Sequence, residues 1–129
     1  MMQLKDSIAE TVNLKMGNTN NLHPAFCFRY THKNFNFKNL NNDTYGMFLD
    51  KIDLLSQLTW QNICQINRYK NGTEKITRSE IKQQIDKCIT EDREIIVFHL
   101  VGKFRIIGCR EGKIFYVLFI DVNGEVYKH

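Results

Sequence analysis

Three runs of apolar, β-branched and aromatic residues fill the C-terminal part of the chain, and turn-forming residues separate them. The breaks fall at Gly102, at Glu111-Gly112 and at Asn123-Gly124. Short apolar runs bounded by glycine are typical of consecutive antiparallel strands, and Asn-Gly is the strongest two-residue hairpin signal. The sequence therefore predicts a C-terminal antiparallel sheet of three or four strands, the last one joined through the Asn123-Gly124 turn.

Cations and groups that exchange protons are distributed along these predicted strands. On a compact sheet they are compatible with binding a phosphate, and they are equally typical of an ordinary sheet with one solvated side. The residues are Lys103, Arg105, Arg110, Lys113, Tyr127, Lys128 and His129.

Length and composition are those of a soluble single-domain protein. The 129 residues, 43% apolar and 25% charged, suffice for a hydrophobic core without disulfides or metal. The formal charge of +4 admits nucleic acid or an acidic protein as a partner without requiring either. No apolar segment approaches the ~20 residues of a membrane span, and the N-terminus lacks the apolar region of a signal peptide. We therefore expect a cytoplasmic protein without membrane contact.

Four isolated cysteines, with no C-x-x-C pair and no Cys–His ligand spacing, give no signal for a metal site. We expect them to be buried, reduced thiols. A glycine-rich phosphate loop, a Ser–His–Asp set and a nucleotide fingerprint are also missing from the sequence, so no cofactor is expected. The cysteines are Cys27, Cys64, Cys88 and Cys109.

The N-terminal part divides into an arm and the start of a domain. Residues 1–24 hold a short amphipathic piece and a polar stretch, which predict a flexible arm, and residues 25–129 form the single domain. Alternating Phe26, Phe28 and Tyr30 predict a half-buried strand over 25–30. A second short strand, or its continuation past a bulge, is expected at 35–37. The strand aromatics suit a core, and single-strand nucleic-acid binders use similar platforms to stack bases.

Helical patterns occupy the middle of the chain. Asn41-Asn-Asp43 supplies an N-cap for a helix that runs through Leu58, and Thr59 begins a second helix with Trp60 as a core anchor, ended by Asn71-Gly72. A third helix is expected after Thr77 or Ser79. Segregated helices and strands define an α+β domain with an N-terminal strand, two to three helices and a C-terminal antiparallel sheet. The third helix's apolar stripe is Ile81, Ile85, Cys88 and Ile89.

This element order and three C-terminal motifs resemble the RelE/ParE-like toxin superfamily. Leu100-Val-Gly-Lys-Phe-Arg-Ile-Ile-Gly108 resembles the family's glycine followed by an aromatic–arginine pair that opens a strand. Lys113–Asp121 resembles its apolar strand, and Glu125-Val-Tyr-Lys-His129 resembles a terminal segment with a tyrosine or histidine. The motifs cover about 35 C-terminal residues and the element order covers the rest, and the resemblance implies a RelE-like fold for the domain.

The resemblance also implies a bacterial toxin–antitoxin or mobile-element endoribonuclease that cleaves mRNA without a metal. Arg105 then stabilises the phosphate, and Tyr127 or His129 acts as acid or base, while Lys103, Arg110 and Lys113 contribute substrate binding. The implied partners are RNA or the ribosome and a cognate antitoxin protein, with a homodimer as a further possibility. ParE-like members act on gyrase instead, so the fold alone does not fix the target.

Two departures from the family pattern favour another class of function. The turn Asp121–Gly124 has an acid where the family often carries a cation, and the helical region is acidic rather than lysine-rich. The competing hypothesis is a non-catalytic interaction protein, a phage- or mobile-element-encoded inhibitor that binds through its sheet and N-terminal arm. Arg105 is then a solvated strand arginine, or one paired with Glu94 or Glu125. His99, between apolar neighbours, is then an outward or hydrogen-bonded sheet histidine.

The alternation of the last strands predicts which side chains share a face. The helices should cover the face with more aromatics, and the N-terminal arm or another chain should cover part of the second. One face is expected to hold Phe104, Ile106, Phe115, Val117 and Phe119, and the other Arg105, Ile107, Tyr116 and Leu118.

Overall fold

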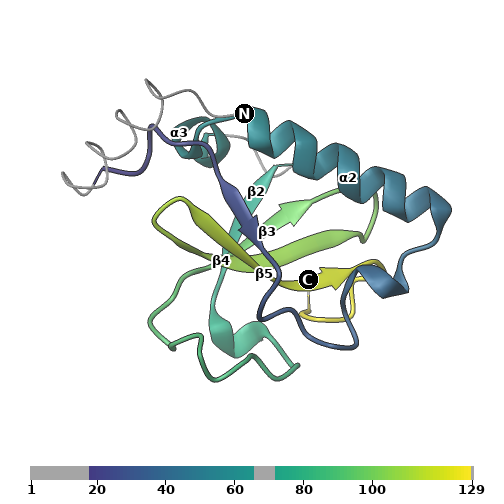
Figure 1. Ribbon diagram of the computed structural model, residues 1–129. Helices are drawn as coiled ribbons and strands as arrows, with labels where there is room; N and C mark the ends of the chain where they lie inside the picture. The colour runs from purple at the N-terminus through teal and green to yellow at the C-terminus, as the bar shows by residue number, and fades with distance from the viewer. Residues whose placement is uncertain (1–17, 66–71, 129) are drawn as a thin grey trace.

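The computed structural model describes residues 18–65 and 72–128, and over these residues it shows a five-stranded mixed sheet with two α-helices on one face (Figure 1). The α+β class predicted from the sequence is confirmed. No helix in the described ranges is long and apolar enough to cross a membrane.

The sheet has the strand order β1-β5-β4-β3-β2. β1 lies parallel to β5, and every other neighbouring pair is antiparallel, so the C-terminal antiparallel sheet is confirmed. β2 was not predicted, because its four residues alternate weakly and follow directly on a predicted turn. The strands are β1 (Ala25–Cys27), β2 (Thr73–Ile76), β3 (Ile95–His99), β4 (Arg105–Glu111) and β5 (Ile114–Asp121).

Both predicted N-caps are confirmed. α2 (Asn42–Gln57) begins after Asn41, whose side chain and that of Thr44 satisfy each other's backbone N–H groups in a capping box. α3 (Trp60–Cys64) begins after Thr59, whose Oγ1 accepts the Asn62 N–H at 3.3 Å. α3 ends at Cys64 with Gln65 as its C-cap, so the predicted end at Asn71-Gly72 is wrong.

Trp60 is the core anchor that the sequence predicts. Its ring is fully buried, and its indole N–H donates to the Lys113 carbonyl at 2.9 Å. This bond fixes α3 over the turn between β4 and β5.

The two faces of the sheet carry separate apolar clusters. The helix-side cluster includes Phe98, Phe104 and Phe115, so the helices cover the face with more aromatics, as predicted. Gly108 permits a close crossing there, since a Cβ would lie 2.0 Å from the Tyr116 carbonyl oxygen. The register shifts at this point, and Leu118 is left without a partner across the strand pair.

This bulge explains the one wrong side assignment in the sheet. Because Leu118 is the extra residue, Phe119 lies on the second face with Leu118 and Ile107 instead of on the helix side. The predicted faces of the other residues are confirmed.

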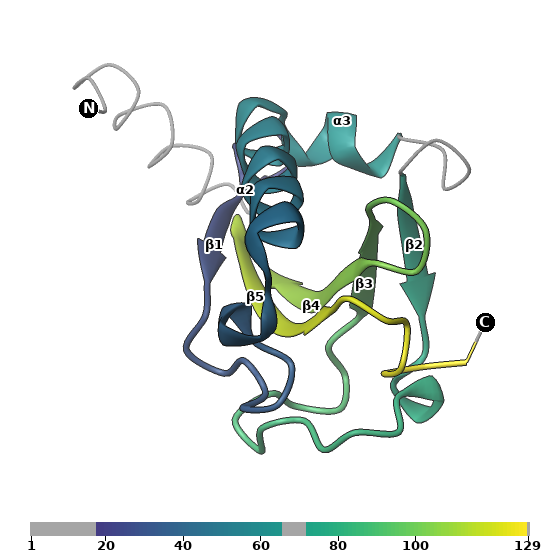
Figure 2. The same cartoon turned by 90° about the vertical axis from the view of Figure 1, so that its right-hand side faces the viewer.

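The predicted third helix is absent from the described residues. A 3-10 turn, η3 (Arg78–Glu80), leads instead into an irregular segment, residues 81–90, called here the strap. The strap crosses the second face (Figure 2), where Ile81, Ile85 and Ile89 pack on the sheet. The Lys82 N–H donates to the Val126 carbonyl at 3.1 Å, so tertiary contacts use backbone groups that a helix would need. Isoleucines four residues apart can therefore lie on one side of the chain both in a helix and in this strap.

Three further strand predictions are wrong. The strand expected over residues 25–30 ends at Cys27, and Tyr30 packs on the second face while Phe26 and Phe28 pack on the helix side. Residues 37–39 form the 3-10 helix η1 (Phe37–Asn39) rather than a strand, with Asn36 as its N-cap. After β5 the chain turns at Gly124, whose φ is +70°, but the segment that follows pairs with the strap through an Ile81–Tyr127 bridge instead of with β5. The second face is therefore covered by the chain's own strap and C-terminal segment.

Residues 18–24, expected in the arm, include contacts with the domain. Leu22 is buried, and its carbonyl accepts the Trp60 N–H at 3.0 Å. The Asn20 carbonyl accepts the Gln61 N–H at the same distance, 3.0 Å. The rest of the predicted arm, residues 1–17, lies outside the described residues.

Candidate functional site

A row of polar side chains crosses the second face near one end of the sheet. His99 on β3 pairs with Arg105 on β4, and Arg105 pairs with Asp121 on β5. Glu74 on β2 pairs with Val97, which belongs to the same face, so it stands next to His99. Tyr127 of the C-terminal segment lies over these residues. These five residues are called here the polar row.

Glu74 links two other members of the row. Its Oε2 accepts a hydrogen bond from His99 Nε2 at 2.8 Å and another from the Tyr127 hydroxyl at 3.2 Å. The side chains of His99 and Glu74 are only 14% and 18% exposed. This charged hydrogen bond is therefore sheltered from water, where it is stronger than at a surface.

Arg105 has the most unusual environment in the row. The residue is 9% exposed, and its Nε and Nη1 have no hydrogen-bond partner. Its Cζ lies 6.0 Å from the centroid of the Tyr127 ring. No ion pair joins it to a carboxylate in the part of the chain that the structure describes, and Glu94 pairs with Lys75 instead. A buried cation with unsatisfied N–H groups destabilises a fold and calls for a functional explanation.

Asp121 shapes the segment that carries Tyr127. Its side chain is 1% exposed, and its two carboxylate oxygens accept the Glu125 and Val126 N–H groups, each at 2.9 Å. The Asp121 carboxylate thus has a structural role. It folds the C-terminal segment back across the polar row.

Tyr127 is held as a neutral donor. Burial, together with the nearby Glu74 charge, raises its pKa to about 12, while the Arg105 charge acts in the opposite direction. The hydroxyl therefore stays protonated at neutral pH and can give a proton to a stronger base. Only 3% of the residue is exposed, so its hydroxyl is enclosed by the protein.

The structure brings together two of the residues predicted for the site, Arg105 and Tyr127. Lys103 is exposed in the turn between β3 and β4, at the same end of the sheet. Arg110 and Lys113 lie at the other end of the β4–β5 hairpin, five and more residues from Arg105, which is roughly 17 Å along a strand. His129 lies outside the described residues.

Arg110 makes several contacts that hold the fold together. Its guanidinium lies 4.4 Å from the centroid of the Trp60 ring and donates to Thr19 Oγ1, Asn20 Oδ1 and the Gly112 carbonyl. It therefore fastens residues 19–20 to the hairpin. Burial lowers the pKa of this guanidinium from its ordinary value.

Glu74 and His99 were not predicted as site residues. His99 is the hydrogen-bonded sheet histidine that the sequence suggests, but its position beside Arg105 depends on the strand register. Glu74 belongs to the unpredicted strand β2. A weak signal existed in the alternation Thr73-Glu-Lys-Ile76, which places Glu74 and Ile76 on one face.

The thiols do not form a second site. Cys109 is buried, and burial raises its pKa to about 11, but Cys64 and Cys88 are exposed, so the expectation that all thiols are buried is wrong. Among the described residues, no group of three or more His, Cys, Asp or Glu side chains is placed to hold a metal ion.

Comparison of the chain with protein-family models, curated proteins and solved structures gave no match. The functional argument therefore depends on the polar row itself.

Proposed function

We propose that the polar row is the active site of a metal-independent endoribonuclease of the RelE-like kind. The observation that carries the proposal is the buried Arg105 guanidinium, in which two nitrogens, Nε and Nη1, have no hydrogen-bond partner. A phosphate oxygen is the ligand that such a fork binds best. Proton-transfer groups stand directly beside it, which is the combination that phosphodiester cleavage needs.

The reaction is an intramolecular transesterification of RNA. In the neutral His99 ring, Nε2–H donates to Glu74 and Nδ1 is the basic nitrogen, which takes the proton from a ribose 2′-hydroxyl. The 2′-oxygen then attacks phosphorus, and the bond to the 5′-oxygen breaks. The products are a 2′,3′-cyclic phosphate and a free 5′-hydroxyl.

The other members of the row stabilise this reaction. Glu74 stabilises the His99 imidazolium that forms, and Arg105 stabilises the charge on the phosphorus oxygens. Tyr127, protonated because of its raised pKa, gives its proton to the leaving 5′-oxygen. DNA is not a substrate, because it lacks the attacking hydroxyl.

Substrate access requires movement of the C-terminal segment. Tyr127 is buried with its ring over Arg105, the neighbouring Val126 is also buried, and the strap bridges to Tyr127. Residues 122–128 therefore swing away when RNA enters, and they bring Tyr127 to the leaving group when they return. Conformational closure of this type also excludes water from the reaction.

The remaining family-level expectations stay part of the proposal. The element order of a strand, two helices and an antiparallel meander supports a RelE-like relationship, as does the tyrosine near the C-terminus. On this proposal the target is mRNA, free or on a ribosome, and an antitoxin protein restrains the enzyme in a bacterial or mobile-element setting.

Cleavage assays with a labelled single-stranded RNA and with ribosome-bound mRNA test this function. Arg105→Ala should lower the cleavage rate by about 10²- to 10³-fold, the effect of losing one transition-state donor. Arg93→Ala is the matched control, since Arg93 forms a surface ion pair with Glu111 at the opposite end of β3. EDTA should leave the rate unchanged.

The proposal fails if the wild-type protein leaves both RNAs intact, or if Arg105→Ala cleaves as fast as Arg93→Ala. The products give a separate check. A 3′-phosphate or a 5′-phosphate formed without a cyclic intermediate would exclude the 2′-hydroxyl as the nucleophile.

A second candidate function is a non-catalytic interaction protein. Large apolar side chains are exposed where α2 meets the turn after β3, with Leu54 52% and Val101 61% exposed. Together with Met47 they line a hollow of about 280 Å³. Sedimentation of the wild type and of Leu54→Glu tests the simplest version, a homodimer through this surface, which the charge should dissociate.

A further inference from the structure

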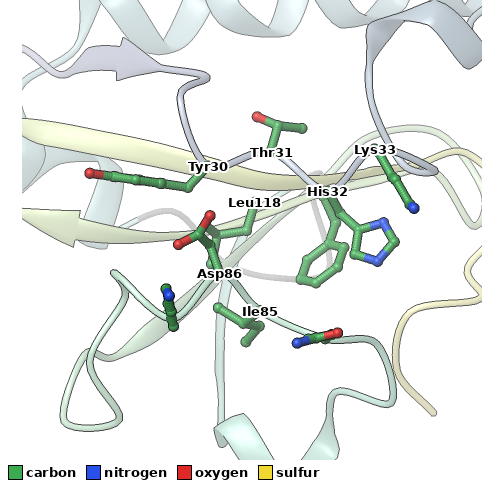
Figure 3. Close-up of a pocket in the computed structure, with 10 residues that line it drawn as sticks. Tyr30, Thr31, His32, Lys33, Ile85, Asp86 and Leu118 are labelled. Carbon is green, nitrogen blue, oxygen red and sulfur yellow. The ribbon is translucent and has the colours of Figure 1, made fainter.

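A second hollow lies on the same face of the sheet as the polar row. It has a volume of about 410 Å³, within the range of small-ligand sites. Its walls come from residues 30–33, residues 84–87 of the strap, and Leu118 and Phe119 of β5. Figure 3 shows Tyr30 and His32 flanking it, with Ile85 and Asp86 contributed by the strap. It is called here the Tyr30–His32 cavity.

The aromatic rings of the cavity are held in fixed positions. The His32 ring stacks on Phe119 with centroids 5.5 Å apart at 29°, and Tyr30 packs on Tyr116 with centroids 5.5 Å apart. The backbone N–H of His32 donates to the Leu118 carbonyl at 2.8 Å, which fastens residues 30–33 to β5. Rings fixed in this way bind a flat ligand with little loss of entropy.

The polar atoms of His32 have defined roles. The Asn34 N–H donates to His32 Nδ1 at 3.1 Å, so the neutral ring carries its proton on Nε2. His32 is therefore a hydrogen-bond donor for a carbonyl or ring nitrogen of a ligand. Its ring also makes a T-shaped contact with Phe35, with centroids 5.4 Å apart, which holds it in place.

Charges at the cavity favour an anionic ligand. Lys33 and Lys87 contribute cations, against one carboxylate, Asp86. The Cys88 N–H donates to Asp86 at 2.9 Å, and hydrogen bonds from Cys88 lower the pKa of that carboxyl. Asp86 is thus a permanent acceptor, suited to an exocyclic amino group, while the lysines suit phosphates.

The cavity stands in a simple geometric relation to the polar row. Phe119 and Asp121 lie on the same face of β5, two residues and about 6.6 Å apart. Asp121 pairs with Arg105 across the strands. With ~6.6 Å along β5 and ~4.8 Å across to β4, the Phe119 wall of the cavity lies roughly 8 Å from Arg105, a distance suited to about one step of an extended nucleotide chain.

We propose that the Tyr30–His32 cavity binds the nucleobase next to the scissile phosphate of single-stranded RNA. The inference rests on the proposed nuclease function and adds its substrate class and a specificity site. A base enters the cavity only when it is unpaired and unstacked, so duplex RNA is excluded. The stacking faces tolerate any base, and His32 Nε2–H with Asp86 reads the base edge.

The experiment compares cavity variants with matched surface variants on short single-stranded RNAs that differ in one base. Tyr30→Ala and His32→Ala should each lower kcat/KM by about 5- to 150-fold, the effect of losing one base-stacking contact. Tyr45→Ala and His23→Ala are the controls, since Tyr45 and His23 are exposed and lie outside the cavity. Unchanged kcat/KM in both cavity variants overturns the inference.

His32→Phe keeps the ring and removes the Nε2–H donor, which protects the test against simple unfolding. It should retain most of kcat/KM but lose the preference among the four bases. Thermal unfolding of each variant shows whether the fold is intact. A base preference identical to that of the wild type excludes His32 as the reader of the base edge.

Binding separates this inference from the nuclease proposal. A single-stranded DNA oligonucleotide, which lacks the 2′-hydroxyl, should bind the wild type and bind His32→Ala more weakly in fluorescence anisotropy. If RNA is not cleaved but this pattern holds, the nuclease function fails and the cavity stands. If RNA is cleaved but Tyr30→Ala and His32→Ala match their controls in cleavage and binding, the cavity fails and the nuclease stands.

Discussion

At the scale of single residues, Arg105 destabilises the folded state, yet it has a proposed role in binding the phosphate. Water would satisfy its guanidinium at a surface, but Arg105 is 9% exposed and the Tyr127 ring of the C-terminal segment lies over it. Burying unsatisfied N–H groups lowers the free energy of unfolding by about 1–3 kcal/mol. Residues retained in spite of such an effect are frequently those that bind ligands.

We predict that Arg105→Met stabilises the protein, raising the free energy of unfolding by about 1 kcal/mol, because methionine fills the space without unsatisfied donors. Urea denaturation measures the change. Arg78→Met is the matched control with the opposite sign, since Arg78 Nη1 donates to the Ile89 and Thr90 carbonyls at 2.8 and 3.0 Å. If Arg105→Met is the more destabilising of the two, Arg105 is structural.

We predict that Glu74→Gln lowers the pKa of Tyr127 from about 12, since the Glu74 charge is one of the causes that raise it. Arg105→Met should raise the pKa of Tyr127, because it removes a positive charge next to the ring. An ultraviolet titration of the tyrosines, with Tyr127→Phe to identify its signal, measures both shifts. Glu125→Gln, an exposed neighbour, should leave the titration unchanged.

At the scale of elements, the β4–β5 pair determines which side chains lie on each face of the sheet. The extra residue Leu118 moves Phe119 and Asp121 onto the second face, and Asp121 then folds the C-terminal segment over Arg105. The backbone of β5 crosses so close to Gly108 that no side chain fits there. The bulge therefore depends on that glycine.

We predict that Gly108→Ala destabilises the protein by about 3 kcal/mol, because the new Cβ would lie 2.0 Å from a backbone oxygen that cannot move away alone. Gly46→Ala is the matched change in α2, where a Cβ meets nothing within 4 Å. It should stabilise by about 0.5–1 kcal/mol through helix propensity. Chemical denaturation measures the free energy of unfolding of both variants. Equal changes in the two would contradict the close approach of β5 to Gly108.

At the scale of the whole molecule, the sheet is enclosed from both sides by different means. Two helices cover one face, and irregular chain from residues 77–94 and 122–128 covers the other (Figure 2). Irregular segments generally open more easily than helices packed on a sheet. The proposed entry route for RNA uses this difference.

We predict that stability declines above pH 9 in two stages. Burial raises the pKa of Cys109 from 9.0 to about 11 and that of Tyr127 from 10.0 to about 12. The folded state therefore favours the protonated forms, whose stabilisation is complete below the unfolded values and is lost as pH rises through the folded ones. Thermal unfolding measures this decline at increasing pH. Cys109→Ala should remove the stage at the lower pH. Cys64→Ala, which replaces an exposed thiol, should leave both stages unchanged.

The sequence determined those parts of the molecule in which local chemistry agrees with the final packing. Asn41 and Thr59 cap their helices because a side-chain oxygen satisfies nearby N–H groups in any context. The apolar runs of β3, β4 and β5 become neighbouring strands because glycine turns join them. Arg105 and Tyr127 were proposed for one site because of the resemblance of their segments to the RelE/ParE-like toxins.

Tertiary structure decided the rest, because long-range contacts overrode local preferences. The isoleucines at 81, 85 and 89 suit a helix, yet they cover a sheet face that needs an extended strap. Asn123-Gly124 forms its turn, but the Asp121 carboxylate directs the chain away from β5. Glu74 meets His99 and Tyr127 only when β2, β3 and the C-terminal segment are assembled, and no spacing along the chain encodes that meeting.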